Sequence, residues 1–332
     1  MNVKLCSHSL MIACFWLLPL SAAGQVHAQA QQYPSKSVTI ISDSAAGSTP
    51  DAVLRVIADR LSQSWGQQVL AVNHPGAAGS IAVGRVARAM PDGYTVVLGN
   101  LGTHVFNGAI YPLGYDLVND FEAVALLPSN NQLIIASNAT PASNLRELIA
   151  WVKSNSDKVT CGTAGPGSPS HIAAAYFQNT IGARFQLVPY RGTPQVIQDL
   201  VAGQVDIVFD QVSSSLPQVR AGKIKAFAVT AKSRLAAVPE IPSVDEAGLP
   251  GFYTTFWFGL WAPKGTRGSI VERLNAAVVD TLADATVQSR LRDLGSEIPP
   301  RDQQTPHALA SLQKAEIEKW WPIIKAANIK AE

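Results

Sequence analysis

Short strand-like runs alternate with amphipathic helical patterns along most of this chain, and this alternation limits the fold more than any other feature. Ser143–Lys153 carries apolar residues three and four positions apart, as does Thr193–Ala202, which Gly203 would end. Ser269 and Glu272 have the spacing of a capping box and predict the start of another helix. We therefore expect an α/β fold with largely parallel sheets.

Two long apolar runs do not fit within a single sheet. Phe121–Ser137 and Thr254–Pro263 are interpreted as crossovers between two domains. On this interpretation, the first domain is discontinuous and combines residues 31–128 with residues 257–332, and the second domain spans residues 129–256. We expect the two domains to face each other across a cleft.

The first 30 residues have the features of a secretory signal peptide. A positive charge at Lys4 precedes the apolar run Leu10–Ala23, and small residues precede a cleavage point near Ala30. The run is short for a membrane span. Removal of this segment leaves Cys161 as the remaining cysteine, so we expect no disulfide within the exported chain.

Several classes of function find no support in the residues. The formal charge is +2, and no basic run predicts a nucleic-acid partner. Neither a phosphate-binding lysine motif, a dinucleotide G-x-G-x-x-G nor a G-x-S-x-G elbow is present, and the histidines lack metal-ligand spacing. We expect no cofactor, no metal and no catalytic residue. A secreted hydrolase that uses Ser170 or His171 is the alternative.

Three predicted helices start in the same way, with a hydroxyl residue and a proline after a loop of small residues. The pairs are Thr49-Pro50, Ser168-Pro169 and Thr193-Pro194, with Thr49 as a capping hydroxyl in the first. A helix N-terminus favours an anion. Any one of these starts alone is ordinary capping, but their recurrence in both predicted domains favours an anion site in the cleft, with the space above Ser44–Thr49 as one side.

Longer segments carry a resemblance to a known family. They are NHPGAAGSIAVGRVARAMPDGYTVVLGN (Asn73–Asn100), VPYRGTPQVIQDLVAGQVDIVFD (Val188–Asp210) and SVDEAGLPGFYTTFWFGLWAPKGT (Ser243–Thr266). In these segments the chain resembles the Bug-type periplasmic solute-binding receptors of tripartite tricarboxylate transporters. The resemblance implies a two-domain periplasmic-binding fold, type II-like, with a ligand cleft between the domains and the crossover strands as a hinge.

The resemblance also implies a function. Such a receptor is a periplasmic monomer that binds a small organic carboxylate and delivers it to the membrane components of the transporter. The expected ligand is a di- or tricarboxylate, an acidic amino acid or an aromatic carboxylate. A receptor that reports to a sensor protein is the alternative to one that serves a transporter.

The ligand is expected to contact residues of both domains. In the first domain these are Ser44, Ala46, Gly47, Ser48, Thr49, Asp51 and Thr103, and in the second they are Gly167, Ser168, Ser170, His171, Tyr190, Arg191 and Asp210. Asp51 is expected to organise its loop, because its charge would repel an anion. Arg191 suits a second carboxylate through its planar guanidinium, or is a surface residue. Tyr190, Phe256, Trp257 and Phe258 either line an apolar pocket or pack in the core.

The first loop departs from the family pattern, which usually has a proline soon after the strand, then glycines and a threonine. Asp43 stands at the proline position. Ser48 and Thr49 replace glycines, and Pro50 replaces the threonine. These substitutions add hydroxyl groups and reduce backbone freedom. We expect the specificity of this receptor to depend on them.

Overall fold

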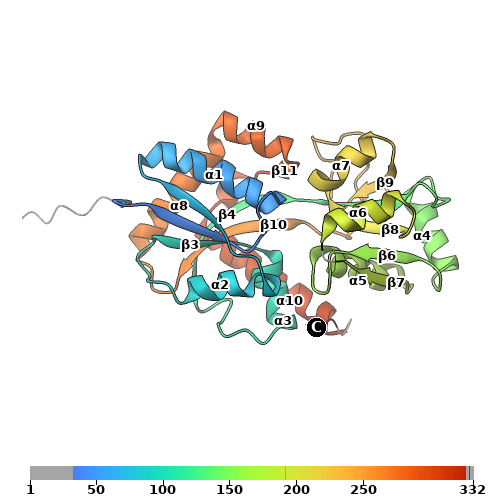
Figure 1. Ribbon diagram of the computed structural model, residues 1–332, viewed down its shortest axis with the longest axis horizontal. Coiled ribbons are helices and arrows are strands. Elements are labelled where there is room, and N and C mark those ends of the chain that lie inside the picture. The colour runs from blue at the N-terminus through green and yellow to red at the C-terminus, as the bar shows by residue number, and fades with distance from the viewer. Residues whose placement is uncertain (1–32, 191, 327–328, 330–332) are drawn as a thin grey trace, which may run out of the picture. The chain divides into compact units, whose positions relative to one another are not determined.

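The computed structural model describes residues 33–190, 192–326 and 329. The predicted signal peptide lies outside the described residues. Two β-sheets with helices on both faces form the described part of the chain (Figure 1). No helix among the described residues has the length and apolar character needed to span a bilayer.

The larger sheet has six strands in the order β11-β4-β10-β3-β1-β2. They are β1 (Val38–Ser42), β2 (Val69–Asn73), β3 (Thr95–Asn100), β4 (Phe121–Asn130), β10 (Phe256–Pro263) and β11 (Ser296–Glu297). β1 pairs in parallel with β2 and β3, whereas β10 runs antiparallel between β3 and β4. The carboxyl ends of β1, β2 and β3 therefore lie at one edge, where α/β sheets usually bind ligands.

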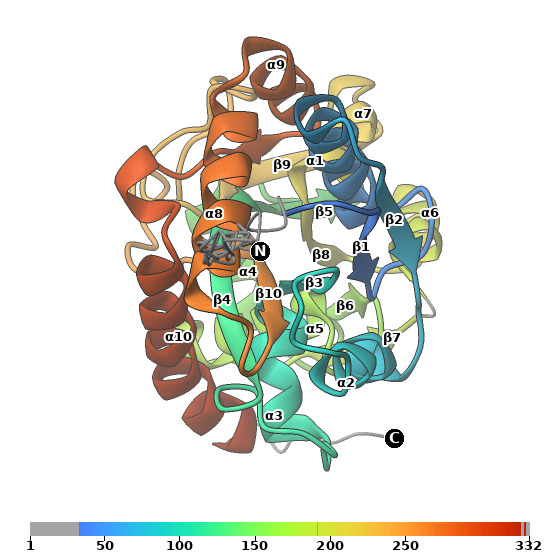
Figure 2. The same ribbon diagram turned by 90° about the vertical axis from the view of Figure 1, so that its left-hand side faces the viewer.

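Helices from both ends of the chain cover this sheet. They are α1 (Thr49–Trp65), α2 (Ser80–Ala87), α3 (Asn107–Ile110), α8 (Gly268–Ala283), α9 (Ala285–Asp293) and α10 (Pro306–Ala326). Figures 1 and 2 show α1 and α9 on one face and α2 and α3 on the other. The apolar stripe Val53, Leu54, Ile57 and Leu61 of α1 is buried, which explains how this helix is held against the strands.

The smaller sheet has five strands in the order β7-β6-β8-β5-β9. They are β5 (Gln132–Ser137), β6 (Thr160–Thr163), β7 (Gln186–Pro189), β8 (Ile207–Gln211) and β9 (Ile224–Val229). Its helices are α4 (Leu145–Ser154), α5 (Pro169–Ile181), α6 (Thr193–Val201) and α7 (Val212–Arg220). β6 pairs in parallel with β7 and β8, while β5 runs antiparallel to both of its neighbours.

The chain passes between the sheets where crossovers were predicted. β4 belongs to the six-stranded sheet and β5, which follows after Asn131, belongs to the five-stranded sheet. On the return, the amide of Thr254 bonds to the carbonyl of Thr230 just before β10 joins the larger sheet. The predicted α/β class with two sheets is confirmed. The exact domain boundaries stay a prediction.

Two predictions were wrong. The sheets are mixed rather than largely parallel, because each crossover strand enters its sheet antiparallel to a neighbour. Ser269 and Glu272 form no capping box, since α8 starts at Gly268 with Arg267 at the N-cap position. By contrast, α6 begins at Thr193 as predicted, with Gly192 at the N-cap position and no side-chain cap.

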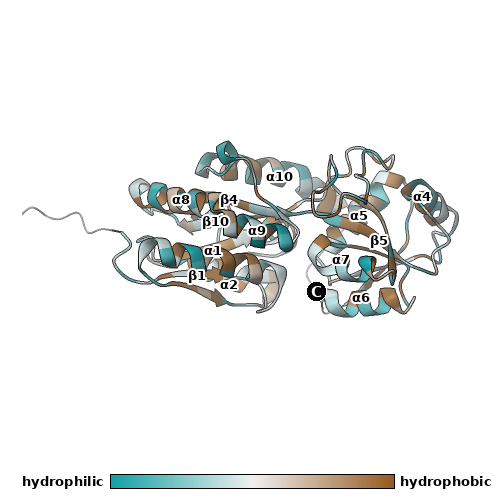
Figure 3. Ribbon diagram, turned by 90° about the horizontal axis from the view of Figure 1, so that it is seen from above, coloured by the Kyte–Doolittle hydropathy of each residue, from teal (hydrophilic) through white to brown (hydrophobic). Residues whose placement is uncertain are grey.

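The core lies between each sheet and its helices. Figure 3 shows apolar residues concentrated on the strands and on the inward sides of helices. Phe256, Trp257 and Phe258 are at most 5% exposed and belong to the core of the larger sheet, and Trp257 also lines a cavity. Trp320 of α10 is buried in the same core. Each fully buried aromatic side chain contributes roughly 1.5–3 kcal/mol or more to stability.

Candidate functional site

The loop between β1 and α1, residues 43–48, forms one side of the candidate site. Ser48, not Thr49, is the N-cap residue of α1, so the predicted capping hydroxyl was wrong. The Ser48 hydroxyl donates to the carbonyl of Ala45 at 2.7 Å and leaves the first turn of the helix uncapped by a side chain. The amide of Ala46 forms no hydrogen bond among the described residues. This loop therefore presents backbone donors at a positive helix end.

Asp51 holds this loop in place from the first turn of α1. One carboxylate oxygen accepts from the amide of Gly47 at 2.8 Å and from Arg55 Nε at 3.0 Å, and the other accepts from Asn73 Nδ2 at 3.0 Å. Burial raises the carboxyl pKa, but the bonds from Arg55, Gly47 and Asn73 outweigh it and leave the pKa of Asp51 below its ordinary value. The amide of Gly47 is thus used within the loop, and Asp51 organises it as expected.

A second carboxylate, Asp43, lies at the carboxyl edge of the parallel strands. Asn100 Nδ2, at the end of β3, donates to its two oxygens at 3.1 and 3.3 Å. The Asp43 side chain packs against Gly79. A Cβ added at Gly79 would lie 2.8 Å from Asp43 Oδ2 and 2.5 Å from Thr103 Cγ2. Burial raises the pKa of Asp43 to about 6, although Asn100 opposes this effect. Asp43 and Asn100 were not among the predicted ligand residues, yet Asp43 directly follows β1 and Asn100 ends β3, and these two strands meet at this edge.

The loop before α5 is the second part of the candidate site. Ser168 is the N-cap of α5 and accepts from the amide of His171 at 3.2 Å, as the Ser-Pro pattern predicts. The hydroxyl of Ser170 accepts from the amide of Ala164 at 2.9 Å and lies 3.1 Å from that of Ser168. Ser170 is only 8% exposed. Its hydroxyl therefore shapes the loop from within.

Residues next to the two loops contact the other half of the chain at two points. Thr49 Oγ1 lies 3.0 Å from the hydroxyl of Ser213 at the start of α7. Gly167 lies close to Ile110 of α3, whose Cδ1 would be 3.0 Å from an added Cβ. The amides of Gly165 and Gly167 form no hydrogen bond among the described residues. Each loop thus has a backbone donor without a partner among the described residues. Ser213 and Ile110 were missed, because no local motif reveals contacts made through a crossover.

The other residues predicted in the smaller sheet already have partners. The hydroxyl of Tyr190 donates to Asp199 at 2.6 Å. Asp210, at the end of β8, is 6% exposed and accepts from the hydroxyls of Ser214 and Ser215. Burial raises the pKa of the Asp210 carboxyl although both serines act in the opposite direction. Tyr190 is therefore positioned by Asp199, and Asp210 anchors the first turn of α7.

Arg191, predicted to meet a second carboxylate, lies outside the described residues.

Thr103 is 1% exposed, and its hydroxyl accepts from the amide of Asn100 at 3.0 Å while lying 3.0 Å from Nδ1 of His104. The His104 ring stacks on Trp261, and burial lowers its pKa to about 3. Thr103 therefore packs beneath Asp43, and the neutral imidazole of His104 lies behind Thr103.

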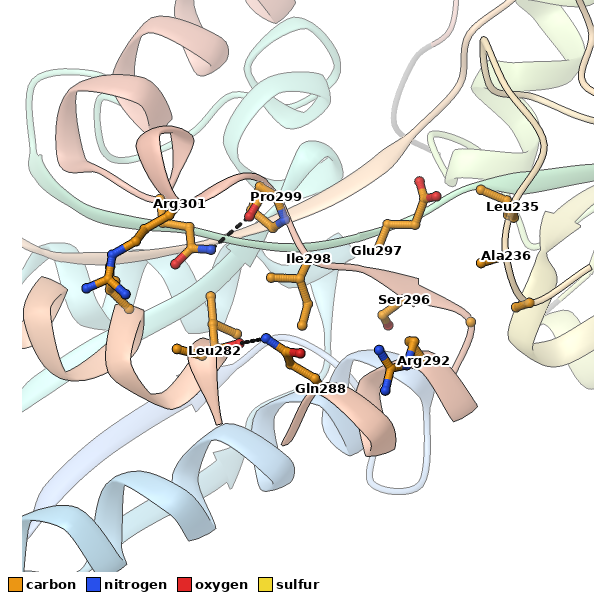
Figure 4. Close-up of a pocket in the computed structure, with 15 residues that line it drawn as sticks. Leu235, Ala236, Leu282, Gln288, Arg292, Ser296, Glu297, Ile298, Pro299 and Arg301 are labelled. Carbon is orange, nitrogen blue, oxygen red and sulfur yellow. Dashed lines mark hydrogen bonds between the residues drawn. The ribbon is translucent and has the colours of Figure 1, made fainter. Parts of the chain in front are cut away.

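Larger cavities lie elsewhere. One of about 480 Å³ is bounded by α8, α9, β11 and the segment 235–237, and Figure 4 shows Leu235 and Ala236 opposite Ser296 and Glu297. Another of about 570 Å³ adjoins it beside Trp257. Neither is lined by a residue of the two loops, although Trp257, which the sequence suggested for an apolar pocket, lines the second cavity. Neither contains the free amides at the helix starts, so we take the two loops as the candidate site.

The described residues offer little for catalysis. They contain no group of His, Cys, Asp and Glu side chains that would hold a metal ion. A serine nucleophile needs a base within hydrogen-bond reach. The hydroxyl of Ser170 contacts the amide of Ala164 and the hydroxyl of Ser168, and neither group is a base. The hydroxyl of Ser170 therefore has no base among its described contacts.

Comparison with known proteins agrees with a binding role. A protein from Agrobacterium vitis, described as the UPF0065 protein in the TAR-I ttuE-ttuC' intergenic region, is 39% identical over 91% of this chain and 87% of its own length. The structure of MatC from Rhodopseudomonas palustris with bound malate matches with a TM-score of 0.78 and 38% identity, covering 88% of this chain and all of that one. Rpa4515 of R. palustris with adipate matches with a TM-score of 0.81 and 32% identity, over 90% of this chain and all of that one.

These matches confirm the two-domain periplasmic-binding fold. The family model described as the tripartite tricarboxylate transporter family receptor matches residues 53–329. That span includes both sheets except β1, together with the start of α5 and the end of β8. The chain therefore belongs to the solute-binding receptors of the tripartite tricarboxylate transporter family.

Proposed function

We propose that this chain is a periplasmic receptor that binds a small organic carboxylate between two domains and delivers it to the membrane components of a transporter. The observation that carries the proposal is the pair of helix starts on different sheets. The amides of Ala46 and Gly167 have no partner among the described residues, and the starts of α1 and α5 place positive helix ends beside them. The structures with bound malate and adipate support the ligand class.

The energetics favour a site built from two loops. A helix N-terminus stabilises an anion by about 0.3–1 kcal/mol, and a hydrogen bond to a charged group adds roughly 1.5–3 kcal/mol. Micromolar affinity corresponds to about 8 kcal/mol. One loop falls short of this value once the cost of association is included. Two facing loops reach it, so the ligand stabilises the arrangement in which both loops contact it.

The remaining parts of the proposal follow the same geometry. Residues 31–128 with 257–332 form one domain and residues 129–256 the other. The expected location is the periplasm, after cleavage near Ala30, and the protein acts as a monomer without a cofactor. Within the ligand class, a dicarboxylate is the leading candidate, with Arg191 contacting its second carboxylate.

Titration calorimetry with purified protein tests the ligand class. The ligands are succinate, malate, adipate, citrate, glutamate and benzoate, with arginine and glucose as cationic and neutral controls. We expect at least one acid to bind and neither control to do so. Binding of a control, with no binding of any acid, would contradict the proposal.

A matched pair of variants tests the loop before α5. Ser168→Asp and Ser168→Asn both keep an oxygen that can accept from the amide of His171, so both keep α5 capped. Only the aspartate adds a negative charge beside the bound carboxylate. We expect Ser168→Asp to lower affinity by about a hundredfold or more and Ser168→Asn to change it by less than about tenfold. Equal affinities of the two variants would remove this loop from the site.

Delivery to a transporter needs a cellular test. Cells that lack the receptor should lose uptake of the labelled ligand identified by calorimetry, and the wild-type chain should restore it. Normal uptake without the receptor, combined with a lost transcriptional response to the ligand, would assign the receptor to a sensor instead.

A further inference from the structure

Asp43, next to the loop before α1, is a carboxylate that lacks a cationic partner among the described residues. It follows β1 directly, is partly buried, and accepts from the neutral side-chain amide of Asn100. It forms no ion pair with any described residue. Asp51, eight positions further along, is bonded to Arg55. The two acidic residues therefore differ, because Asp51 is satisfied by its own loop and Asp43 is not.

The groups around Asp43 do not neutralise it. Asn100 and Thr103 are uncharged, and the next group behind Thr103 is His104, which burial keeps neutral. Tyr115 lies near Asp43, and burial raises its hydroxyl pKa to about 12. Arg88, which acts on Tyr115, forms no ion pair with Asp43. The carboxylate therefore carries an uncompensated negative charge at neutral pH.

An uncompensated, partly buried carboxylate is costly for the free protein. The raised pKa of Asp43, to about 6, expresses that cost. Costly groups of this kind are typical of functional sites. Asp43 lies at the same carboxyl edge of the sheet as the start of α1, where the proposed function places the carboxylate of the ligand. A negative charge there repels an anion but attracts a cation on the same molecule.

We propose that Asp43 binds a positively charged amino group of the ligand, so that the receptor prefers an amino acid to the equivalent carboxylic acid without the amine. This inference rests on the proposed function, because it assumes that the carboxylate of the ligand lies at the two helix starts. Asp43 then sets specificity, while the backbone amides supply binding to the carboxylate. Asn100 positions the Asp43 carboxylate through the bond from its amide.

Calorimetry with paired ligands at pH 7.5 tests this assignment. The pairs are aspartate with succinate, glutamate with glutarate, and alanine with propionate, which differ in one amino group. In the wild type we expect the amino acid of at least one pair to bind about ten to a hundred times more tightly than its partner. In Asp43→Asn that ratio should fall to about one or below. Asp92→Asn, the control, removes a surface carboxylate with the same change in net charge and should keep the wild-type ratio.

The pH dependence of the wild type provides a second measurement that needs no variant. As the pH falls from 7.5 to 5, Asp43 becomes protonated, so the affinity for the amino acid should fall. The affinity for the plain acid should rise over the same range, because a repulsive charge disappears. In Asp43→Asn, the affinities for the amino acid and for the plain acid should no longer change in opposite directions with pH.

The outcomes separate this inference from the function on which it rests. Equal or tighter binding of the plain acids by the wild type, or a ratio unchanged in Asp43→Asn, overturns the role of Asp43 and leaves a carboxylate receptor. Tighter binding of malate, a hydroxy acid, than of aspartate also overturns the inference, because Asp43 would then bind a neutral hydroxyl group of the ligand rather than an amine. Binding of none of the acids overturns the proposed function itself.

Discussion

Replacing Asp51 with alanine is expected to destabilise the protein by about 3–4 kcal/mol. The carboxylate is 3% exposed and accepts bonds from Gly47 and Asn73 in addition to its ion pair with Arg55. The bonds from Gly47 and Asn73 are each charge-assisted and contribute roughly 1.5 kcal/mol or more. Their loss also leaves the amide of Gly47 without an acceptor among the described residues, whereas Asn73 Nδ2 keeps its bond to the carbonyl of Ser44. The Arg55 side chain is exposed, and we assign no stability to its contact.

Urea unfolding followed by tryptophan fluorescence measures this change. The control is Arg55→Gln, which removes the solvent-exposed ion pair and the exposed bond from Arg55 Nη2 to Asn73, and should have a small effect. Because the folded pKa of Asp51 lies below its ordinary value, its contribution is present above the ordinary pKa and is lost as the pH falls through the folded value. The gap between wild type and Asp51→Ala should therefore narrow below about pH 4. Equal stabilities of Asp51→Ala and Arg55→Gln at pH 7 would refute the stabilising role of the bonds from Gly47 and Asn73.

Three further predictions concern other buried groups. Gly99→Ala should destabilise the protein against urea by about 2–4 kcal/mol, because an added Cβ would lie 2.2 Å from the His104 ring. Gly114→Ala, where the added Cβ meets open space, is the control and should change stability little. Similar losses of stability in the two variants would contradict the close packing at Gly99. Cys161 is buried and burial raises its thiol pKa, so a thiol reagent at pH 8 should label it only after unfolding, and rapid labelling of the native protein would show that it is accessible. Asp43→Asn should raise the free energy of unfolding by about 1–3 kcal/mol at pH 7.5 and by little at pH 4. The reason is that the pKa of Asp43 is raised in the folded protein, so the ionised carboxylate costs stability above its ordinary pKa. An equal gain at both pH values would show that ionisation of Asp43 is not the cause.

The sequence predicted the α/β class and the places where the chain changes sheets, because apolar periodicity is a local property. It failed on the direction of the crossover strands. Nothing within Phe256–Pro263 shows that this strand runs antiparallel between β3 and β4, since strand direction depends on how the chain returns. The capping roles of Thr49 and Ser269 were also predicted wrongly, because a hydroxyl residue close to a helix start need not be its cap.

The candidate site was predictable where its contacts are local. Ser168 and Asp51 act on residues three or four positions away, and the sequence pattern indicated both roles. Ser213 meets Thr49 over 164 positions, and no pattern indicates such a pair. Asp43 was noticed as a departure from the family, but its missing counter-charge became visible only when Asn100 proved to be its partner.

The position of β10 also determines when the larger sheet can be assembled. All five strands of the smaller sheet come from the continuous stretch 132–229, so they are available once that stretch has been synthesised. The larger sheet needs β10 between β3 and β4, and residues 256–263 follow the whole smaller sheet in the chain. A nascent chain that ends before Phe256 leaves the facing edges of β3 and β4 unpaired, and such edges are templates for aggregation. The half that begins first is therefore completed last, and it needs protection for longer.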